Sequence, residues 1–346
     1  MQLSLKAYEA RFANFSTLYK AARMPPKVTQ GAVFCCVNPS FILGLGPYAR
    51  QFEAELRTIS YHDYPVSHCS NPHATAADVL SRAASKGQGE KMGVFAKAVA
   101  PLPLWAGEAN SASCGGAPNV SETFASSLWS LDFLAELSKA GVAGVNFHGG
   151  PHPSPAATSD LYSPVAFDDH GNMQVRPLFL GLWAFTEFAA NRSRWLPATT
   201  VKLSGLPGGL FAKHDSYAHA VLSHDSTDAE NTTSRSSACA TLRVLVIVKD
   251  EALSGPMMVT VDVSAALPGF NSSSAAAGVL ERLLAPSLST SNASLITWAG
   301  RSLSNTDGGV LGERVSEPVR RDAGGAFAFS VPPLSAAVLT VRGGCD

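Results

Sequence analysis

The sequence of 346 residues has no apolar run that approaches the roughly 18 residues a bilayer-spanning helix needs. Charged residues make up only 15% of the chain, and the formal net charge is −1. This balance gives no indication of a nucleic-acid partner or of binding to an anionic membrane surface. Hydrophobic residues make up 46%, which is ample for a buried core. The composition therefore predicts an ordinary globular protein without a membrane span.

The usual signatures of metal and nucleophile sites are also missing. The six cysteines, at positions 35, 36, 69, 114, 239 and 345, include no Cys-x-x-Cys pair, and the nine histidines form no His-Glu-x-x-His motif. The absence of a Gly-x-Ser-x-Gly nucleophile elbow disfavours a serine α/β hydrolase. We therefore expect no metal and no cofactor. Cys114 is interpreted as a small packed residue or a local disulfide partner, and Cys239 could pair with Cys345 in an oxidising compartment.

The first 195 residues alternate between helical and strand patterns. We expect helices at 1–21, 48–56, 75–85, 121–139 and 177–191, and strands at 31–37, 56–64, 102–107 and 142–148. Ser121 is the expected N-cap and Gly141 the expected stop of the best helix. The continuous apolar character of 31–37 predicts a strand covered on both faces. About four buried strands that end in polar residues indicate an α/β fold, whereas a closed barrel needs eight.

The pattern changes near Pro197. Short apolar segments separated by loops rich in Ser, Asn, Gly and Asp predict strands at 199–203, 242–248, 257–263, 294–298, 326–330 and 336–341. The nearest approach to a helix is Ala275–Leu284. We therefore predict two domains, an α/β domain over 1–197 and an antiparallel β-sandwich over 198–346.

The stretch with the most chemical information surrounds Glu108. The apolar run 102–106 ends close to this carboxylate, and a polar loop containing Gly115 and Gly116 follows before the next helix. A charge at the end of a buried strand, followed by a loop that lets the backbone approach a ligand, is typical of a barrel active site. On chemistry alone, Glu108 could equally be a solvated loop residue.

Several segments together resemble glycoside hydrolase family 79, the β-glucuronidase and heparanase family. They are Trp105-Ala-Gly-Glu108-Ala-Asn-Ser-Ala-Ser-Cys-Gly-Gly116 with the helix after it, Tyr61-His-Asp-Tyr64, Gly144-Val-Asn-Phe-His148, Tyr162-Ser-Pro164, and parts of the C-terminal strands. The similarity covers most of residues 45–345. It implies about the last four βα units of a (β/α)8 barrel, followed by the family's C-terminal β-sandwich.

The resemblance also implies roles for individual residues. Glu108 corresponds to the nucleophile of a retaining glycosidase, and His62 and Tyr64 are expected to flank it, keeping it charged and aimed. The backbone at Gly115 and Gly116 is expected to approach the carboxylate of a glucuronic acid unit. Three further substrate-binding candidates are Tyr162 for the same carboxylate, and Asn146 and His148 at the rim. A structural histidine at 62, simple strand-end packing of His148 and an ordinary tight turn at 115–116 remain as alternatives.

One departure from the family pattern concerns the acid/base. The family carries it in an Asn-Glu-Pro motif on an earlier strand, and this motif does not occur here. We therefore expect the chain to correspond to the C-terminal part of such an enzyme, with a missing N-terminal half as a partner and little activity of its own. The alternative is a non-catalytic carbohydrate-binding or scaffold protein.

The expected location follows from the same resemblance. The N-terminal 20 residues predict an amphipathic helix, and no signal peptide is visible in them. Glycosylation sequons occur at Asn14, Asn119, Asn191, Asn231, Asn271 and Asn292. We expect the full-length protein to be secreted, extracellular or vacuolar.

Overall fold

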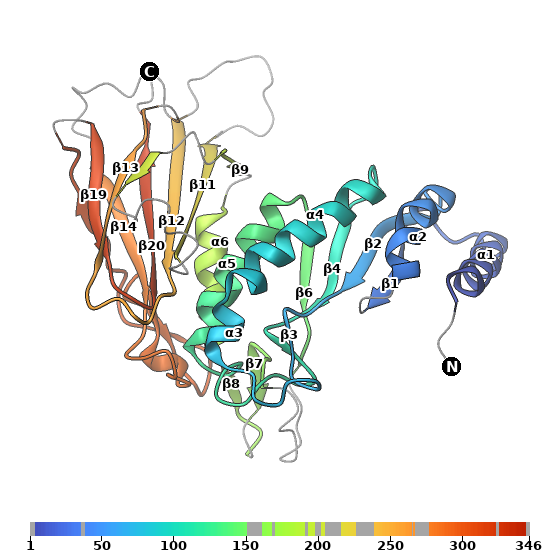
Figure 1. Ribbon diagram of the computed structural model, residues 1–346, viewed down its shortest axis with the longest axis horizontal. Coiled ribbons are helices and arrows are strands. Elements are labelled where there is room, and N and C mark those ends of the chain that lie inside the picture. Colours follow the sequence, from blue (N-terminus) through green and yellow to red (C-terminus); the bar gives the residue numbers. More distant parts are fainter. Residues whose placement is uncertain are drawn as a thin grey trace.

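The computed structural model describes residues 4–35, 39–150, 161–167, 170–190, 193–197, 202–204, 216–225, 239–264, 266, 277–322 and 325–343. Helices and a parallel sheet occupy one end of the molecule, and antiparallel sheets occupy the other (Figure 1). The fold is therefore a mixed α/β structure followed by β structure, as the sequence predicts.

None of the described helices combines the length and apolar composition needed to cross a membrane.

The parallel sheet has four strands in the spatial order β1-β2-β4-β6, which is also their order in the chain. The strands are β1 Thr29–Cys35, β2 Leu56–His62, β4 Leu104–Ala109 and β6 Gly144–Phe147. The main helices are α1 Leu5–Ala21, α2 Pro39–Gln51, α3 Ala76–Leu80, α4 Gln88–Val99, α5 Phe124–Lys139 and α6 Pro177–Phe188, with a π-helical turn at Ala83–Gly87. Because parallel crossovers are right-handed, an order without reversal places the connecting helices on one face of the sheet.

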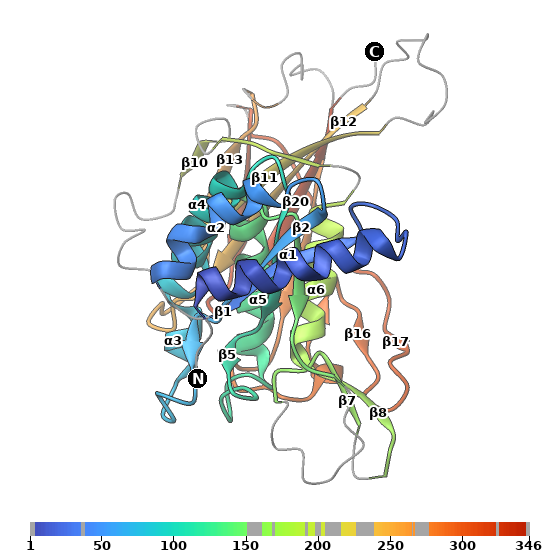
Figure 2. The same cartoon turned by 90° about the vertical axis from the view of Figure 1, so that its right-hand side faces the viewer.

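Aromatic contacts identify the covered face. Tyr61 of β2 packs on Phe95 of α4, and Phe147 of β6 meets Trp129 of α5 edge to face. Side chains alternate along a strand, so Ser60 and His62 point to the opposite face. In Figure 2, α1 lies across the front of the molecule, at the end of the sheet where β1 forms the edge.

The expectation that residues 31–37 form a strand buried on both faces is wrong. The strand forms at Thr29–Cys35, but Val33 is 51% exposed and Cys35 is also exposed. The physical reason is the one-sided helical cover, which leaves alternate side chains of this edge strand open.

Helix boundaries also differ from the sequence patterns. The best helix begins at Phe124 with Thr123 as its N-cap, so the prediction of Ser121 as the cap is wrong. The Ser121 hydroxyl instead accepts hydrogen bonds from the backbone N–H of Ala117 and the hydroxyl of Ser111, at 2.9 and 2.8 Å. Gly141 adopts a φ of 90° directly after the helix, as a helix stop requires.

Antiparallel strands form the C-terminal part. A three-stranded sheet contains β10 Lys202–Ser204, β13 Met257–Asp262 and β19 Ala326–Val331. A seven-stranded sheet contains β9 Arg194–Trp195, β11 Ser216–Asp225, β12 Cys239–Val248, β14 Gly278–Leu284, β15 Thr297–Trp298, β18 Glu317–Val319 and β20 Ser335–Arg342. Val259 and Phe327 of the smaller sheet share one buried cluster with Val244 and Leu339 of the larger sheet.

Four details of this region differ from the sequence patterns. The strand expected over 294–298 is confined to β15, because Ala293–Leu295 forms a 3-10 helix. The segment nearest to a helix, Ala275–Leu284, contains β14, a strand in the larger sheet. β11 was not expected, and β9 joins β11 although it lies before residue 197. The helix-like reading of β14 arises because a short amphipathic strand and a short helix give similar patterns of apolar residues.

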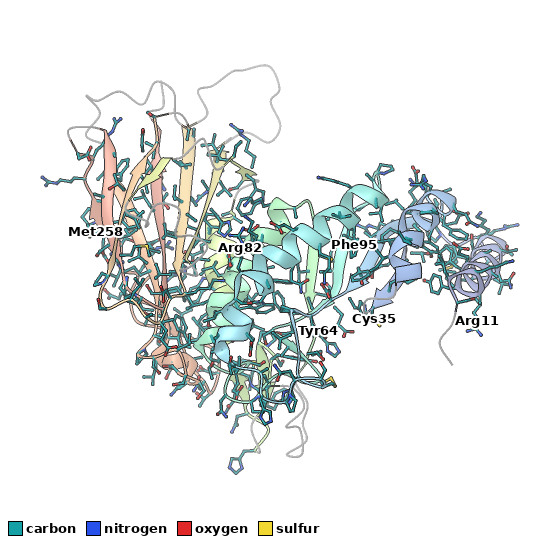
Figure 3. All side chains as sticks on the ribbon, in the orientation of Figure 1. Arg11, Cys35, Tyr64, Arg82, Phe95 and Met258 are labelled. Atoms are coloured by element: carbon teal, nitrogen blue, oxygen red, sulfur yellow. A yellow bond between two sulfur atoms is a disulfide. The ribbon has the colours of Figure 1, made fainter. Side chains whose placement is uncertain are left out.

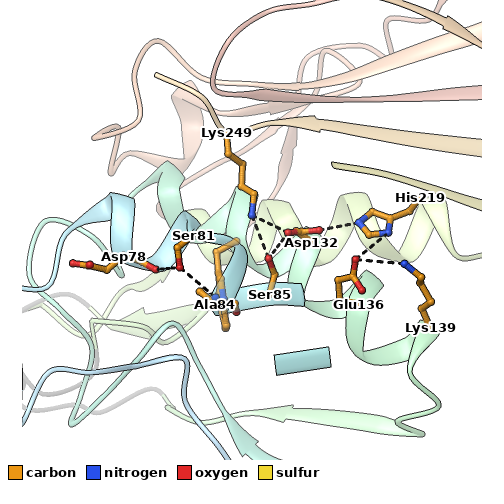
Figure 4. Close-up of polar contacts among 10 residues, drawn as sticks. Asp78, Ser81, Ala84, Ser85, Asp132, Glu136, Lys139, His219 and Lys249 are labelled. Carbon is orange, nitrogen blue, oxygen red and sulfur yellow. Dashed lines mark hydrogen bonds and ion pairs between the residues drawn. The ribbon is translucent and has the colours of Figure 1, made fainter. Parts of the chain in front are cut away.

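A buried ionic network joins the helices to the larger sheet (Figure 4). Asp132 of α5 is fully buried; its Oδ1 lies 2.8 Å from Nε2 of His219 on β11, and its Oδ2 lies 2.8 Å from Nζ of Lys249, directly after β12. The hydroxyl of Ser85 donates to the same Oδ2, and Nζ of Lys249 lies 3.2 Å from Ser85 Oγ. Burial raises the pKa of Asp132. The charge of Lys249 and the hydrogen bond from His219 lower this pKa by more than burial raises it, so the net pKa lies below its usual range.

The same network brings Asp132, Glu136 and His219 together as three potential metal ligands, with their ligand atoms within 4.8 Å of one another. The ammonium group of Lys249 already supplies a positive charge to Asp132. Glu136 in turn lies 3.5 Å from Lys139. The arrangement is therefore explained by ion pairing between α5 and the sheet.

Replacing Lys249 by methionine should lower the free energy of unfolding by about 3–5 kcal/mol, because the Asp132 charge would stay buried without its main partner. The control is Lys139→Met, since Lys139 is 44% exposed and its ion pair is worth at most about 1 kcal/mol. Urea unfolding at pH 7 measures both. A loss of less than 1 kcal/mol for Lys249→Met would contradict this account.

Candidate active site

Three polar side chains meet where neighbouring parallel strands end. His62 is the last residue of β2, Glu108 is the penultimate residue of β4, and His148 follows β6. The backbone N–H of Asp63 donates to the carbonyl of Glu108 at 3.0 Å, and that of His148 donates to Ala109 at 3.0 Å. The carboxyl ends of parallel strands share one edge of the sheet, so this edge collects the side chains that the sequence singles out.

The carboxylate of Glu108 has a polar side chain beside each of its oxygens. Tyr64 donates its hydroxyl to Oε1 at 2.7 Å, and Nδ1 of His62 lies 3.2 Å from Oε2. Nδ1 of His148 lies 3.9 Å from Oε1. The side chain of Glu108 is 29% exposed, so a ligand can reach it. Figure 3 labels Tyr64 below the ends of the parallel strands.

Burial sets the protonation of the two flanking groups. It is the largest cause of the lowered pKa of His62; the nearby Glu108 charge opposes this shift and His148 adds to it. His62 is therefore neutral at pH 7. Burial, followed by the hydrogen bond to Glu108, raises the pKa of Tyr64 above its usual range. Tyr64 therefore stays a hydrogen-bond donor at neutral pH.

A disulfide holds the two loops that carry this site. Cys69 and Cys114 are bonded, and the short strands β3 Val66–Ser67 and β5 Ala112–Ser113 pair in parallel beside them. Of the two interpretations of Cys114, the local disulfide partner is therefore correct. The suggested pairing of Cys239 with Cys345 lies outside the described residues because it involves Cys345.

The two glycines of the site have positive φ values, 86° at Gly115 and 96° at Gly116. A Cβ on Gly116 would lie 2.9 Å from Cβ of Ser121, and the carbonyl of Gly115 accepts a hydrogen bond from the N–H of Leu161 at 2.8 Å. Glycine is thus required at 116 by close internal packing. Contact between this backbone and a sugar carboxylate stays a prediction.

Tyr162 lies at the site and Asn146 lies at its rim. The buried Tyr162 places its hydroxyl 2.5 Å from Nδ1 of His148, and its ring centroid lies 6.4 Å from that of Tyr64. Asn146 is exposed on β6 and donates from Nδ2 to the carbonyl of Gly107 at 3.4 Å. The structure therefore gathers Glu108, His62, Tyr64, His148 and Tyr162, with Asn146 on the adjoining strand.

Sequence reasoning missed Asn110 as a residue of this site. Its fully buried amide donates to the carbonyl of His148 at 2.7 Å and to that of Tyr162 at 3.1 Å, while its Oδ1 accepts from the N–H of Ser111. One side chain thus fixes both segments that follow β6. The only signal in the sequence is an asparagine two residues after the carboxylate, which does not reveal partners 38 and 52 residues away.

Comparison with known proteins identifies the class of fold. The chain is similar to a 4-O-α-L-rhamnosyl-β-D-glucuronidase from Fusarium oxysporum, with a TM-score of 0.73 and 20% identity over 97% of this chain and 65% of that one. It is also similar to an α-L-arabinofuranosidase from Thermotoga maritima, with a TM-score of 0.55 and 13% identity over 97% and 61% of the two chains. A third similar structure is a GH51 arabinofuranosidase from Xanthomonas axonopodis pv. citri, with a TM-score of 0.58 and 11% identity over 99% of this chain and 63% of that one. The fold is therefore that of glycoside hydrolases.

A match to a family model is found in the C-terminal part of the chain. Residues 227–338 match the glycosyl hydrolase family 79 C-terminal beta domain, which confirms the predicted resemblance to family 79. No curated protein matches the chain significantly. The chain spans just under two thirds of the length of each of the three structures above.

The lowered pKa of His62 predicts a specific pH dependence of stability. Below the unfolded-state pKa of about 6.5, the unfolded chain takes up a proton that the folded chain resists, so the free energy of unfolding rises with pH through this range. His62→Gln should remove this part of the rise between pH 5 and 7.5, as measured by urea unfolding. The control is the exposed His73→Gln, which should keep it. An unchanged rise in His62→Gln would contradict the assignment.

Proposed function

We propose that this chain forms the nucleophile-bearing part of a retaining glycoside hydrolase that acts on glycans containing glucuronic acid. The observation that carries the proposal is the Glu108 carboxylate, partly exposed at a strand end and contacted by Tyr64 at one oxygen and His62 at the other. The family 79 match of the C-terminal part and the glucuronidase named among the similar structures support the choice of substrate.

In the proposed first step, a Glu108 oxygen attacks the anomeric carbon as the bond to the leaving oxygen breaks. This forms a glycosyl ester on Glu108, which water then hydrolyses. The donor contacts from Tyr64 and neutral His62 restrict the rotation of the carboxylate, so that a lone pair is presented to the substrate. Nδ1 of His148 lies 3.9 Å from Oε1 of Glu108, the oxygen that Tyr64 contacts, and the hydroxyl of Tyr162 orients the His148 ring.

The leaving oxygen needs a proton from a second carboxyl group, about 5–5.5 Å from the nucleophile in retaining enzymes. The contacts of the Glu108 carboxylate are to a tyrosine and two histidines. We propose that the second carboxyl comes from a partner polypeptide that packs against the exposed face of β1. The exposure of Val33 and Cys35 on that strand supports this placement.

The remaining substrate contacts follow from the same arrangement. Tyr162 and the backbone at Gly115 and Gly116 are proposed to bind the sugar carboxylate, and Asn146 and His148 are proposed to line the rim.

The Cys69–Cys114 disulfide supports a secreted, extracellular or vacuolar location, because such bonds persist in oxidising compartments.

A mechanism-based inhibitor tests the nucleophile directly. A 2-deoxy-2-fluoroglucuronyl fluoride has a leaving group that needs no acid catalyst, so it should label Glu108 even without the proposed partner. Peptide mass spectrometry is expected to find the adduct on Glu108 and none in Glu108→Gln. Binding of glucuronides without labelling would instead favour the non-catalytic carbohydrate-binding alternative.

Tyr64→Phe tests the role of the hydroxyl in that labelling. Loss of the 2.7 Å hydrogen bond should slow labelling of Glu108 by about 10- to 100-fold, which corresponds to one hydrogen bond to a charged group. Tyr19→Phe is the matched control, because Tyr19 lies on α1, away from the site. Equal labelling rates in Tyr64→Phe and the wild-type chain would exclude a positioning role for Tyr64.

A further inference from the structure

A second polar groove lies between the larger antiparallel sheet and the last turn of α6. Its volume is about 720 Å³, within the roughly 300–1,000 Å³ typical of small-molecule sites. Residues of β12, β14, β20 and α6 line it, and it shares no lining residue with the site around Glu108. The groove is therefore separate from the proposed catalytic centre.

The two carboxylates of this groove are already paired. Arg314 binds both oxygens of Glu281, at 2.5 and 2.7 Å, and also lies 2.8 Å from Glu187. Arg301 lies 2.9 Å from the other oxygen of Glu187. Arg314 and Arg301 thus neutralise the charges of Glu281 and Glu187, so these carboxylates would not repel an anion that enters the groove.

Two more arginines reach the groove from neighbouring strands. Arg243 of β12 stands directly opposite Thr340 of β20, and Arg342 lies two residues farther along β20, so all three side chains share one face of the sheet. Arg243 donates to the hydroxyl of Ser223 at 3.0 Å. Arg342 is exposed and has no ion-pair partner among the residues that the structure describes. Three arginines against two glutamates give the lining a formal excess of one positive charge.

Apolar side chains also line the groove. Val279 and Val338 line it beside the hydroxyl of Thr340. A sugar ring offers C–H surface to these apolar side chains, hydroxyl groups to Thr340, and a carboxylate or sulfate substituent to the guanidinium groups.

We propose that this groove is a second, non-catalytic binding site for an anionic saccharide, with Arg342 as its anion-binding group. A short oligosaccharide that carries carboxylate or sulfate groups would lie across β12 and β20. The proposal does not depend on hydrolysis at Glu108, because the two sites are built from different residues.

The experiment is ligand protection of arginine side chains in the full chain. Phenylglyoxal modifies exposed guanidinium groups, and peptide mass spectrometry reports modification at Arg342 and at Arg320, an exposed arginine of the same region that does not line the groove. Tetragalacturonate and a sulfated tetrasaccharide are the probes, with neutral cellotetraose and inorganic sulfate as comparisons. We expect at least one anionic probe to protect Arg342 while Arg320 stays equally reactive.

A variant pair gives the independent measurement. By calorimetric titration, Arg342→Gln should weaken binding of the protecting probe to the groove by about tenfold, the effect of one charged hydrogen bond, and Arg320→Gln should leave it unchanged. Labelling of Glu108 should be equal in both variants. Protection of Arg342 by cellotetraose or by inorganic sulfate alone, no protection by either anionic probe, or unchanged affinity in Arg342→Gln would each overturn the proposal.

Discussion

The buried carboxylate of Asp132 is the contact on which the arrangement of the two parts depends. It lies on α5, the helix that follows the Glu108 loop, and it binds Lys249 and His219 from the antiparallel sheet. An unpaired charge at full burial would cost several kcal/mol, so α5 is stable against the sheet only in the position that satisfies both partners. Because the loop between β4 and α5 begins directly after Ala109, next to Glu108, this contact also limits where the candidate nucleophile can lie.

The candidate site adds a second level of constraint nearer to the chemistry. The strand ends supply Glu108, His62 and His148, while the disulfide and Asn110 hold the loops that supply Tyr64 and Tyr162. Each oxygen of the carboxylate then faces a group able to donate a proton or a hydrogen bond. These contacts hold one carboxylate in place, and the proposed mechanism requires a second carboxyl group close to it. The anion-binding groove lies apart from this constellation, so glycan binding and bond cleavage can be tested independently.

Several features were accessible from the residues alone. Alternating helix and strand patterns predicted the α/β part, and short apolar segments between turn residues predicted the antiparallel part. The motif around Glu108, with the other segments quoted above, predicted a resemblance to family 79, and residues 227–338 match that family's C-terminal beta domain. The resemblance also implied that His62 and Tyr64 would flank Glu108 and that His148 would lie at the rim, and the structure places all three beside that carboxylate. Local pattern was sufficient for these features, since each depends on residues close together in the chain.

Other features were decided only by tertiary structure. The pattern over β14 is the nearest approach to a helix in its region, and the pattern over β1 predicts burial on both faces, because periodicity does not report which neighbours cover a segment. The partners of Asn110 and Asp132 lie between 38 and 117 residues away along the chain, and the Cys69–Cys114 bond spans 45. Such contacts are set by how sheets and helices pack. The sequence by itself therefore determined the fold class, the family resemblance and the candidate nucleophile, whereas packing decided which distant groups hold that nucleophile and join the two parts.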